Sequence, residues 1–352
     1  MIKQVTTESA KLYLGLDIHK KTWKFHFATD VVNGIGRSFP PCVETIRKYV
    51  NKHYGGYEVS VAYEAGCCGY QPARAFISYG WDTYVFNPAD LPRPSKNNFT
   101  KTDKIDARNI GLQLRSGHLK KLEFPDETRE ALRSLTRQRT AMVREFRRVK
   151  SRIKSLLLYN YIKIPEGLES PKWTKDFLEW LTTLDLKEGN TLLTLRSMLS
   201  QYRFVDLELK SLSNEMRAYC RKHHKTDYYL LRSVPGIAGL TASYILAELG
   251  DLRRFSSVKK LASYVGFVPG LHQSGGSTYT TGATPRANRH IRNLLVESAW
   301  VAIRSDPAME RYYRSHAGKN SKAVAFKVGR KLLCRIFAVI KTQTPYEIGV
   351  VS

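Results

Sequence analysis

The first third of the chain alternates short apolar runs with amphipathic segments, which is typical of a domain that mixes strands and helices. Trp23–Thr29 alternates apolar and polar residues as a half-buried strand does, and Asn33-Gly34 offers a hairpin turn after it. The expected strands are Tyr13–Asp17, Trp23–Thr29, Tyr57–Tyr63 and Thr83–Asn87, the expected helices are Val43–Asn51 and Lys104–Ser116, and Leu91–Thr102 is expected to be a loop. These elements predict an α/β domain over residues 11–124.

The middle of the chain carries two stretches in which apolar residues recur at alternating steps of three and four, the spacing of a coiled-coil seam. The first comprises Leu132, Leu135, Met142, Phe146, Val149, Ile153 and Leu156, with Arg139 in one core slot. The second, which contains one stutter, comprises Leu195, Leu199, Tyr202, Val205, Leu209, Leu212, Met216 and Tyr219. We expect a helical coiled-coil arm over residues 127–224, whose seams pair either within one chain as an antiparallel hairpin or with another subunit.

The first of these seams is strongly basic. Residues 129–163 contain 11 Lys or Arg and only 2 Asp or Glu. A helical linker with solvated charges would explain the excess, but we favour an arm that contacts nucleic acid, because phosphates attract such a surface. The expected contact residues are Arg139, Arg147, Arg148 and Lys150.

The last third, residues 228–346, is expected to be mainly helical with a polar loop in its middle. Val234-Pro235-Gly236-Ile237-Ala238-Gly239 places turn residues before a helix over Ala242–Leu249. This pattern is similar to a helix-hairpin-helix element, which binds phosphate through backbone N–H groups. Gly270–Asn288 is rich in glycine and polar residues and predicts a loop, and residues 285–341 predict a basic helical region with 13 Lys or Arg against 3 acids.

The whole chain is more basic than solubility alone requires. Its 352 residues include 57 Lys or Arg against 31 Asp or Glu, a formal net charge of +26. Nucleic acid is the expected partner, because a surface this positive repels itself unless an anion binds it. Hydrophobic residues make up 42% of the chain, enough to bury cores. No apolar run approaches the roughly 20 residues that span a bilayer, so we expect no membrane association.

The five cysteines are odd in number and scattered, and none has zinc-finger spacing with a partner. They are Cys42, Cys67, Cys68, Cys220 and Cys334. The first residues also lack the apolar stretch of a signal peptide. We therefore expect a reduced, cytoplasmic protein whose cysteines are packing residues.

Four carboxylates stand at positions where strands end or a helix begins. Asp17 closes the first apolar strand, Glu64 follows the strand that ends at Tyr63, and Asp103 and Asp106 are spaced to share one helix face. An acid at the end of an apolar strand is costly without a partner, although single acids commonly cap or solvate strand ends. Carboxylates from separate elements can hold two divalent ions about 3.5–4 Å apart, which bind the attacking and leaving oxygens of phosphoryl transfer. Mg²⁺ prefers such oxygen ligands.

The motifs around these acids give the chain a family resemblance. Gly15-Leu16-Asp17, Tyr63-Glu64-Ala65-Gly66 and Lys101-Thr102-Asp103-Lys104-Ile105-Asp106-Ala107 resemble the N-terminal domain of the DEDD transposases, an insertion-sequence family related to Piv-type DNA invertases. Leu231–Phe255, Leu261–Pro269, Ser274-Gly275 and Asn288–Ala299 resemble that family's second domain. The resemblance implies a ribonuclease-H-like (RuvC-type) fold for the first domain, with Asp17, Glu64, Asp103 and Asp106 holding Mg²⁺, and a mainly α C-terminal transposase domain.

The resemblance also implies partners. These are double-stranded target and donor DNA, and a bridge RNA that guides the enzyme by pairing with both. Metal and serine sites from different subunits would combine in a homo-oligomer, a dimer or a tetramer. Such a protein would act at the nucleoid of a bacterial cell. The composition permits an RNA partner and does not by itself reveal one.

The Gly-rich segment 270–278 holds the second chemical candidate. Taken alone it is best explained as a flexible loop, yet a serine there could attack a phosphodiester if its hydroxyl were activated. The resemblance places the nucleophile at the Ser-Gly step, which is Ser274. Ser277 stays an alternative, and His272 is either a neighbour of the site or a surface residue. Three arginines after the segment either contact phosphates or form a solvated helix face: Arg286, Arg289 and Arg292.

Three functions remain open at this point. The first is an RNA-guided transposase that cuts DNA by serine attack, forms a 5′-phosphoserine link and rejoins the strands. The second is a RuvC-like nuclease or junction resolvase that uses water. The third is a nucleic-acid-binding protein without catalysis, in which Asp17→Ala or Glu64→Ala would change no activity.

Overall fold

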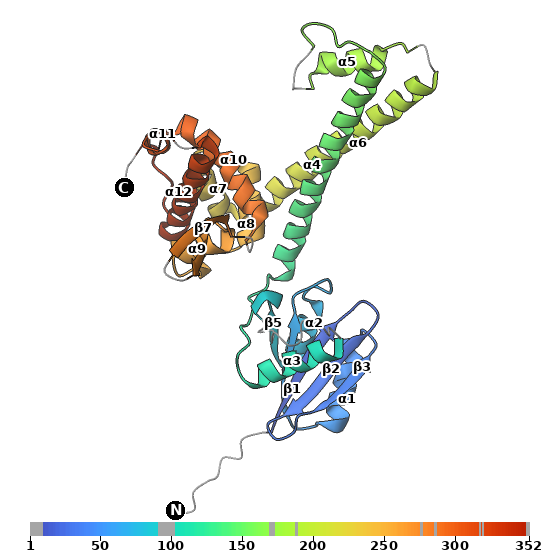
Figure 1. Ribbon diagram of the computed structural model, residues 1–352, viewed down its shortest axis with the longest axis vertical. Coiled ribbons are helices and arrows are strands. Elements are labelled where there is room, and N and C mark those ends of the chain that lie inside the picture. Colours follow the sequence, from blue (N-terminus) through green and yellow to red (C-terminus); the bar gives the residue numbers. More distant parts are fainter. Residues whose placement is uncertain are drawn as a thin grey trace, which may run out of the picture. The chain divides into compact units, whose positions relative to one another are not determined.

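The computed structural model describes residues 10–90, 103–168, 173–186, 189–274, 277–284, 287–316, 318 and 320–349, without the side chains of 90, 103, 104, 269–274 and 277–283. The chain divides into one compact unit up to Phe124 and a second from Pro125 onward (Figure 1). The loop expected over Leu91–Thr102 lies outside the described residues.

The described part of the first unit is built on a mixed five-stranded sheet with the strand order β3-β2-β1-β4-β5. Its elements are β1 Lys11–Ile18, β2 Trp23–Thr29, β3 Ile35–Phe39, α1 Val43–His53, β4 Glu58–Glu64, α2 Gln71–Ser78, β5 Asp82–Phe86, a 3₁₀ turn at Pro88–Asp90 and α3 Asp103–Arg115. β1, β4 and β5 run parallel to one another, and β2 and β3 are antiparallel to their neighbours. An α/β first unit is therefore confirmed.

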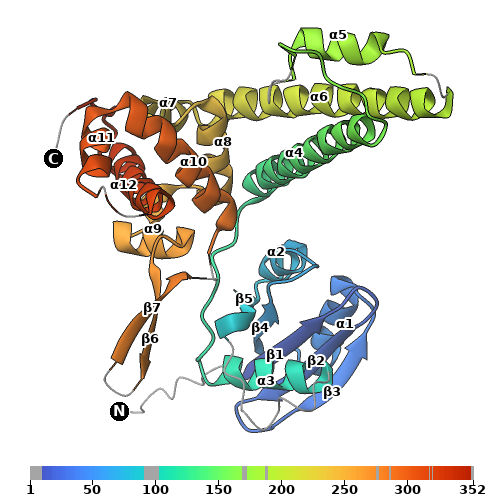
Figure 2. The same ribbon diagram turned by 45° about the horizontal axis from the view of Figure 1, so that its top comes forward.

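The two faces of this sheet follow from alternation along its strands. Leu12, Leu14 and Leu16 of β1 pack in one core with residues of α1 and α2. The intervening positions face the other way, where Ala62 of β4 packs with Ile110 of α3. Helix α3 therefore covers one face of the sheet, and α1 and α2 cover the opposite face (Figure 2).

Helix α3 lies directly against the backbone of β1. A Cβ atom on Gly15 would be only 2.2 Å from the Gly111 backbone nitrogen and 2.3 Å from the Ala107 carbonyl oxygen. A glycine inside a strand commonly marks a close backbone approach of this kind. The Gly15–Gly111 crossing therefore fixes where α3 rests on the sheet.

Two elements of the first unit escape sequence-based prediction. β3 is an edge strand whose residues are mostly exposed, so it has no apolar alternation to reveal it. α2 is only eight residues long and has Pro72 in its first turn. The expected strands and the two expected helices are confirmed with small shifts of their ends.

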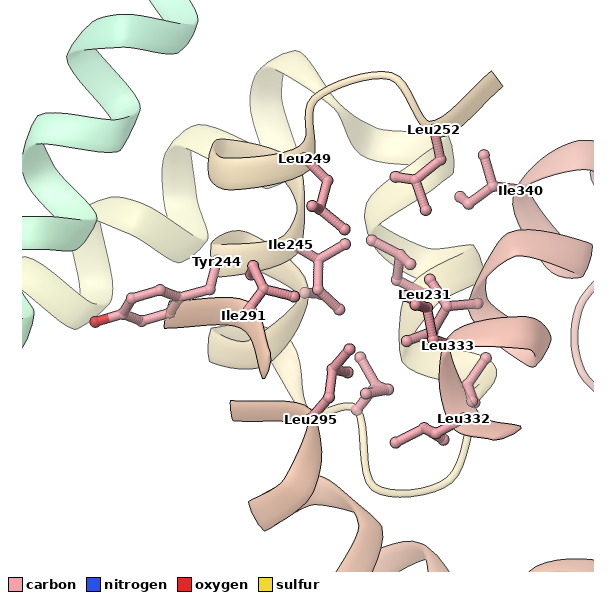
Figure 3. Close-up of a cluster of buried hydrophobic side chains, with 14 of the residues drawn as sticks. Leu231, Tyr244, Ile245, Leu249, Leu252, Ile291, Leu295, Leu332, Leu333 and Ile340 are labelled. Carbon is pink, nitrogen blue, oxygen red and sulfur yellow. The ribbon is translucent and has the colours of Figure 1, made fainter. Parts of the chain in front are cut away.

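The second unit is mostly helical. Its elements are α4 Glu127–Tyr159, α5 Lys175–Thr183, α6 Gly189–His223, α7 Lys225–Ser233, α8 Gly239–Leu249, a 3₁₀ turn at Leu252–Arg254, α9 Val258–Val265, β6 Pro269–Ser274, β7 Ser277–Ala283, α10 Arg289–Ser305, α11 Pro307–Arg314 and α12 Ser321–Thr342. Figure 3 shows its main core, where Leu231 of α7, Ile245 of α8, Leu295 of α10 and Leu333 of α12 converge. The C-terminal part of the chain is thus a helical body with one strand pair.

The long helices α4 and α6 pack against each other as an antiparallel pair within one chain (Figure 2). Arg139 donates a hydrogen bond to Ser213, and Arg152 donates one to Gln201. Residues later in α4 therefore contact residues earlier in α6, as two antiparallel helices require. Near its far end the pair shares a core with α5 that includes Val149, Ile153, Leu195 and Phe177. The two predicted seams therefore meet each other.

The loop expected over Gly270–Asn288 is wrong for most of its length, because β6 and β7 form an antiparallel hairpin there. We name Pro269–Ala283 the serine hairpin. Serine, threonine and glycine dominate it, so no apolar alternation marks its strands, and the backbone ladder supplies the order. The register pairs Ser274 with Ser277, and the hairpin extends away from α9 (Figure 2).

All five cysteines are unpaired, and Cys220 is fully buried in the main core of the second unit. Packing is thus the role of at least this thiol. Among the described helices, none combines the length and the apolar content needed to cross a bilayer.

Candidate functional site

Asp17 and Glu64 lie side by side at the carboxyl edge of the parallel strands β1 and β4. The register pairs Leu16 with Tyr63, so each acid is the next residue along its strand. Each acid also lies two positions beyond a residue that faces α3, Gly15 on β1 and Ala62 on β4. Alternation therefore directs both carboxylates to the α3 face of the sheet.

Helix α3 runs antiparallel to β1, so its first turn lies at this same edge. Its last residue, Arg115, donates a hydrogen bond to the Thr29 carbonyl, and Thr29 pairs with Leu12 near the start of β1. Asp106 lies five residues before the Gly111 crossing, about 7.5 Å along a helix axis. Asp17 lies two residues beyond Gly15, about 6.6 Å along a strand. The start of α3 and the end of β1 therefore meet at one edge.

Asp17 has a basic environment within the sheet. The His19 Nε2 atom lies 3.1 Å from Asp17 Oδ2, and the side chain of Asp17 is 19% exposed. Lys24 stands directly opposite Asp17 on β2. His26, two residues further along β2 and beneath α3, is buried; burial lowers its pKa, and the charges of Arg108 and Arg115 lower it further. The carboxylate of Asp17 thus has a cationic side chain and an imidazole beside it.

The chemistry of this edge fits a divalent metal. Its potential donors are the carboxylates of Asp17 and Glu64 at two neighbouring strand ends, and oxygen ligands of this kind suit a hard cation. The structure does not gather Asp106 with these two acids into one cluster. Among the side chains that the structure describes, no group of three or more His, Cys, Asp or Glu is gathered to hold an ion. The backbone of Asp103 begins α3, and its side chain lies outside the description.

The serine candidates lie at the tip of the serine hairpin, in the second unit. Ser274 ends β6 and Ser277 begins β7. His272 pairs with Tyr279, two residue pairs before the Ser274–Ser277 pair. The hairpin thus carries both serines at one end and returns the chain to α10 at the other.

The four basic residues expected on α4 divide into two kinds. Arg147 and Arg148 are exposed, and Arg148 pairs with the neighbouring Glu145. Arg139 instead donates to the Ser213 hydroxyl at 2.8 Å and to the Tyr244 hydroxyl at 3.4 Å. Lys150 points into an aromatic cage formed by Phe146, Trp173 and Tyr202, with its Nζ atom 4.2 Å from the nearest ring centre. Burial lowers the pKa of Lys150. Two of the four therefore hold the arm together.

The arginines after the serine hairpin also differ in setting. Arg289 is exposed at the start of α10. Arg292 donates to the Thr284 carbonyl at 3.2 Å, which ties α10 to the end of β7. Arg286 lies outside the described residues.

Sequence patterns alone do not reveal two features that shape these sites. One is the Gly15–Gly111 crossing, for which the glycine within a strand is the available signal. The other is Glu248, a fully buried acid in the apolar helix α8, for which the signal is a lone charge among apolar residues. Burying such a charge requires partners that lie far away in the sequence.

The family models that match this chain follow the same two-part organisation. The model of the DEDD transposase domain of IS110 elements matches residues 14–161. The model described as "Transposase IS116/IS110/IS902 family" matches residues 228–314. Together the two matches cover more than half of the chain, and the first contains all four candidate acids while the second contains Ser274.

Similar proteins carry related names. The y4qE protein of Sinorhizobium fredii, whose name describes a transposase, is 29% identical over 82% of this chain and 71% of its own length. The transposase for insertion sequence element IS1533 of Leptospira borgpetersenii is 25% identical over 82% of this chain and 85% of its own. The pilin gene-inverting protein of Moraxella bovis is 32% identical over 34% of this chain and 38% of its own. The chain therefore belongs to the DEDD transposases of the IS110 family, and as a transposase it is an enzyme.

Proposed function

We propose that this transposase is guided by an RNA and that it cuts and rejoins DNA strands with a metal-binding acidic site and a serine nucleophile. The observation that carries the proposal is the placement of Asp17 and Glu64 on one face of the sheet, at the edge where α3 begins. Two carboxylates on one face at neighbouring strand ends suit phosphoryl transfer, in which acids hold the divalent ions that bind the attacking and leaving oxygens.

Asp17, Glu64, Asp103 and Asp106 would hold the divalent ions, for which we propose Mg²⁺. Bound there, the ions would supply charge stabilisation to the oxygens around the reacting phosphorus. His19 would orient the carboxylate of Asp17 through the contact described above. In this way a residue of the chain itself would hold one of the acids in place before DNA arrives.

The serine hairpin would supply the nucleophile, for which we propose Ser274. Its Oγ atom attacks the phosphorus, the bond from phosphorus to the 3′ oxygen breaks, and the proton of the hydroxyl passes to that leaving oxygen. The product is a 5′-phosphoserine, and attack by another strand's 3′ hydroxyl reverses the step. No water is consumed, so the strands are rejoined without hydrolysis.

Exposed basic side chains on two helices support the proposal that the protein binds nucleic acid. The exposed Arg147 and Arg148 lie on α4 of what we propose is a coiled-coil arm, and Arg289 lies at the start of α10. The turn between α7 and α8 has Gly236 at φ +85°, where a Cβ atom would be 2.5 Å from the Ser298 carbonyl oxygen. We propose that this turn is a helix-hairpin-helix element. Guide RNA, target DNA and donor DNA would share these surfaces in a dimer or tetramer at the bacterial nucleoid.

A covalent-trapping experiment tests the proposal. Full-length protein with Mg²⁺, its guide RNA and labelled DNA is expected to form a protein–DNA adduct that survives denaturation. Ser274→Ala should abolish the adduct, and Ser277→Ala should retain it. An adduct lost only in Ser277→Ala would move the nucleophile, and hydrolysed DNA without any adduct would identify a nuclease that uses water.

A further inference from the structure

The first half of α4 meets the end of α8 through a cluster of charged and polar groups, which we name the α4–α8 joint. Its members are Arg129, Arg133 and Arg137 of α4, Glu248 of α8 and Asn288 at the start of α10. The arginines are four residues apart and share one face of their helix. Glu248, on which they converge, is 1% exposed.

Both carboxylate oxygens of Glu248 are occupied. Arg137 donates from Nε to Oε1 at 3.1 Å and from Nη2 to Oε2 at 3.5 Å. The Nε atom of Arg133 lies 3.4 Å from Oε2 as an ion pair without hydrogen-bond geometry. The Asn288 Nδ2 group donates to the same Oε2 at 3.1 Å. The buried carboxylate of Glu248 therefore joins α4 to the start of α10, two elements that are far apart in the sequence.

Arg129 reinforces the joint from the end of the helix. It donates to the carbonyl oxygens of Ala247 and Glu248, which are among the last carbonyls of α8. Cations are favourable at this end of a helix. Gly250 follows at φ +64°, and a Cβ atom there would be 2.4 Å from the Arg129 guanidinium carbon. The backbone after α8 is thus shaped to admit this arginine.

Asn288 connects the joint to α9 and to α10, the helix that follows the serine hairpin. It is the N-cap of α10, and its Oδ1 atom accepts a hydrogen bond from the Ile291 backbone N–H at 3.2 Å. It follows the end of β7 by five residues, and its own backbone N–H donates to the Tyr264 carbonyl of α9. The side-chain amide of Asn288 therefore caps α10 with its oxygen and donates a hydrogen bond to Glu248 with its nitrogen.

We propose that Glu248 is a positioning residue for the strand-transfer reaction. By binding Arg133 and Arg137 on one side and Asn288 on the other, it fixes the start of α10 to the arm helix. Arg292 of α10 in turn holds Thr284, the residue after the serine hairpin. The inference rests on the proposed role of the hairpin serine. When the arm binds nucleic acid, this connection would hold the serine nucleophile at a fixed distance from the DNA strand that the serine attacks.

Asn288→Asp separates this role from helix capping. Aspartate caps a helix as well as asparagine does, but it has no donor for Glu248 and sets a second carboxylate against it. The matched control is Asn320→Asp, because the exposed Asn320 also caps a helix, its Oδ1 atom accepting a hydrogen bond from the Lys322 N–H at the start of α12. A second variant, Glu248→Gln, removes the charge from the other side of the contact.

The measurements are adduct formation by the full-length protein, its affinity for guide RNA and DNA, and amide hydrogen exchange along α4 and the first turn of α10. We expect Asn288→Asp to form the adduct roughly 10- to 100-fold more slowly, as a nucleophile displaced by about 1 Å would. Affinity should be unchanged, and the amides at the start of α10 should exchange faster. The Asn320→Asp control should match the parent protein in all three.

Wild-type adduct rates in both Asn288→Asp and Glu248→Gln would overturn the inference, as would an equal loss in Asn320→Asp. If the parent protein itself forms no adduct, the proposed function has failed. The joint is then judged on exchange alone: unchanged protection of α10 in Asn288→Asp refutes it, and faster exchange there supports it.

Discussion

Replacing Gly15 with alanine tests whether the contact between α3 and β1 places the acidic site. The new Cβ atom would lie 2.2 Å from the Gly111 nitrogen, 2.3 Å from the Ala107 oxygen and 2.6 Å from the Gly111 Cα. Atoms in ordinary contact are about 3.5–4.0 Å apart. The opposing atoms are backbone, so no side-chain rotation relieves the clash, and α3 must move by about 1 Å or more.

Two effects compete in the stability of Gly15→Ala. Alanine reduces the entropy of the unfolded chain, which stabilises a protein by about 0.4–1 kcal/mol where the site admits it. Overpacking costs about 1–3 kcal/mol. The clash should prevail, so we expect a net loss in the free energy of unfolding that leaves the protein folded.

The effect on activity should exceed the effect on stability. Helix α3 begins with Asp103 and carries Asp106 in its first turn, and a misplacement of about 1 Å can cost roughly 100-fold in rate. The assay is the rate of adduct formation with saturating nucleic acid, beside denaturant unfolding. Gly189→Ala, at the start of α6, is the control, since its new Cβ would meet nothing within 4 Å. A folded Gly15→Ala protein that reacts at the parent rate would refute the reasoning.

Three further predictions follow from the described contacts. Burial alone would raise the pKa of Glu248, but the hydrogen bond from Arg137 and the charge of Arg133 hold that pKa below its ordinary 4.5. A group whose pKa is lowered by folding stabilises the protein above its unfolded pKa, and this stability is lost as pH falls. The free energy of unfolding should therefore drop below about pH 4.5 in the parent and less so in Glu248→Gln, which denaturant unfolding at a series of acid pH values would show. Arg147→Gln should lower the slope of log affinity against log salt by about 0.9 if it binds one phosphate of duplex DNA, which salt-dependent binding measures. Arg139→Gln should instead lower the free energy of unfolding by about 1 kcal/mol, because it removes the hydrogen bonds to the half-buried Ser213 and the buried Tyr244 hydroxyls, and thermal unfolding checks this.

Much of the first unit is predictable because its strands are apolar or alternate cleanly. The run ending at Asp17 and the strand ending at Tyr63 are both predictable as strands, but their parallel pairing, which brings the two acids to one edge, is known only from the structure. β3 has neither signal, since its residues are mostly exposed. The strands of the serine hairpin are equally hard to predict, because their polar residues are typical of a loop, although the backbones of the two strands pair regularly.

The contacts that position the sites are less accessible to sequence reasoning. Arg137 and Glu248 are 111 residues apart, and no local pattern links them. The basic excess on α4 suggested phosphate contacts throughout, yet Arg139 and Lys150 make internal contacts in the structure. A count of charges cannot separate these uses, because both need a long cationic side chain on the same helix.

The location of a bound divalent ion tests the central claim most directly. Crystals of the full-length protein soaked with Mn²⁺, whose anomalous scattering identifies it, should show an ion with carboxylate oxygens of Asp17 and Glu64 within about 2–2.5 Å. Asp17→Asn should weaken or remove that peak. An ion bound elsewhere on the chain, or a peak at this edge that survives Asp17→Asn unchanged, would contradict the assignment of these acids to the metal.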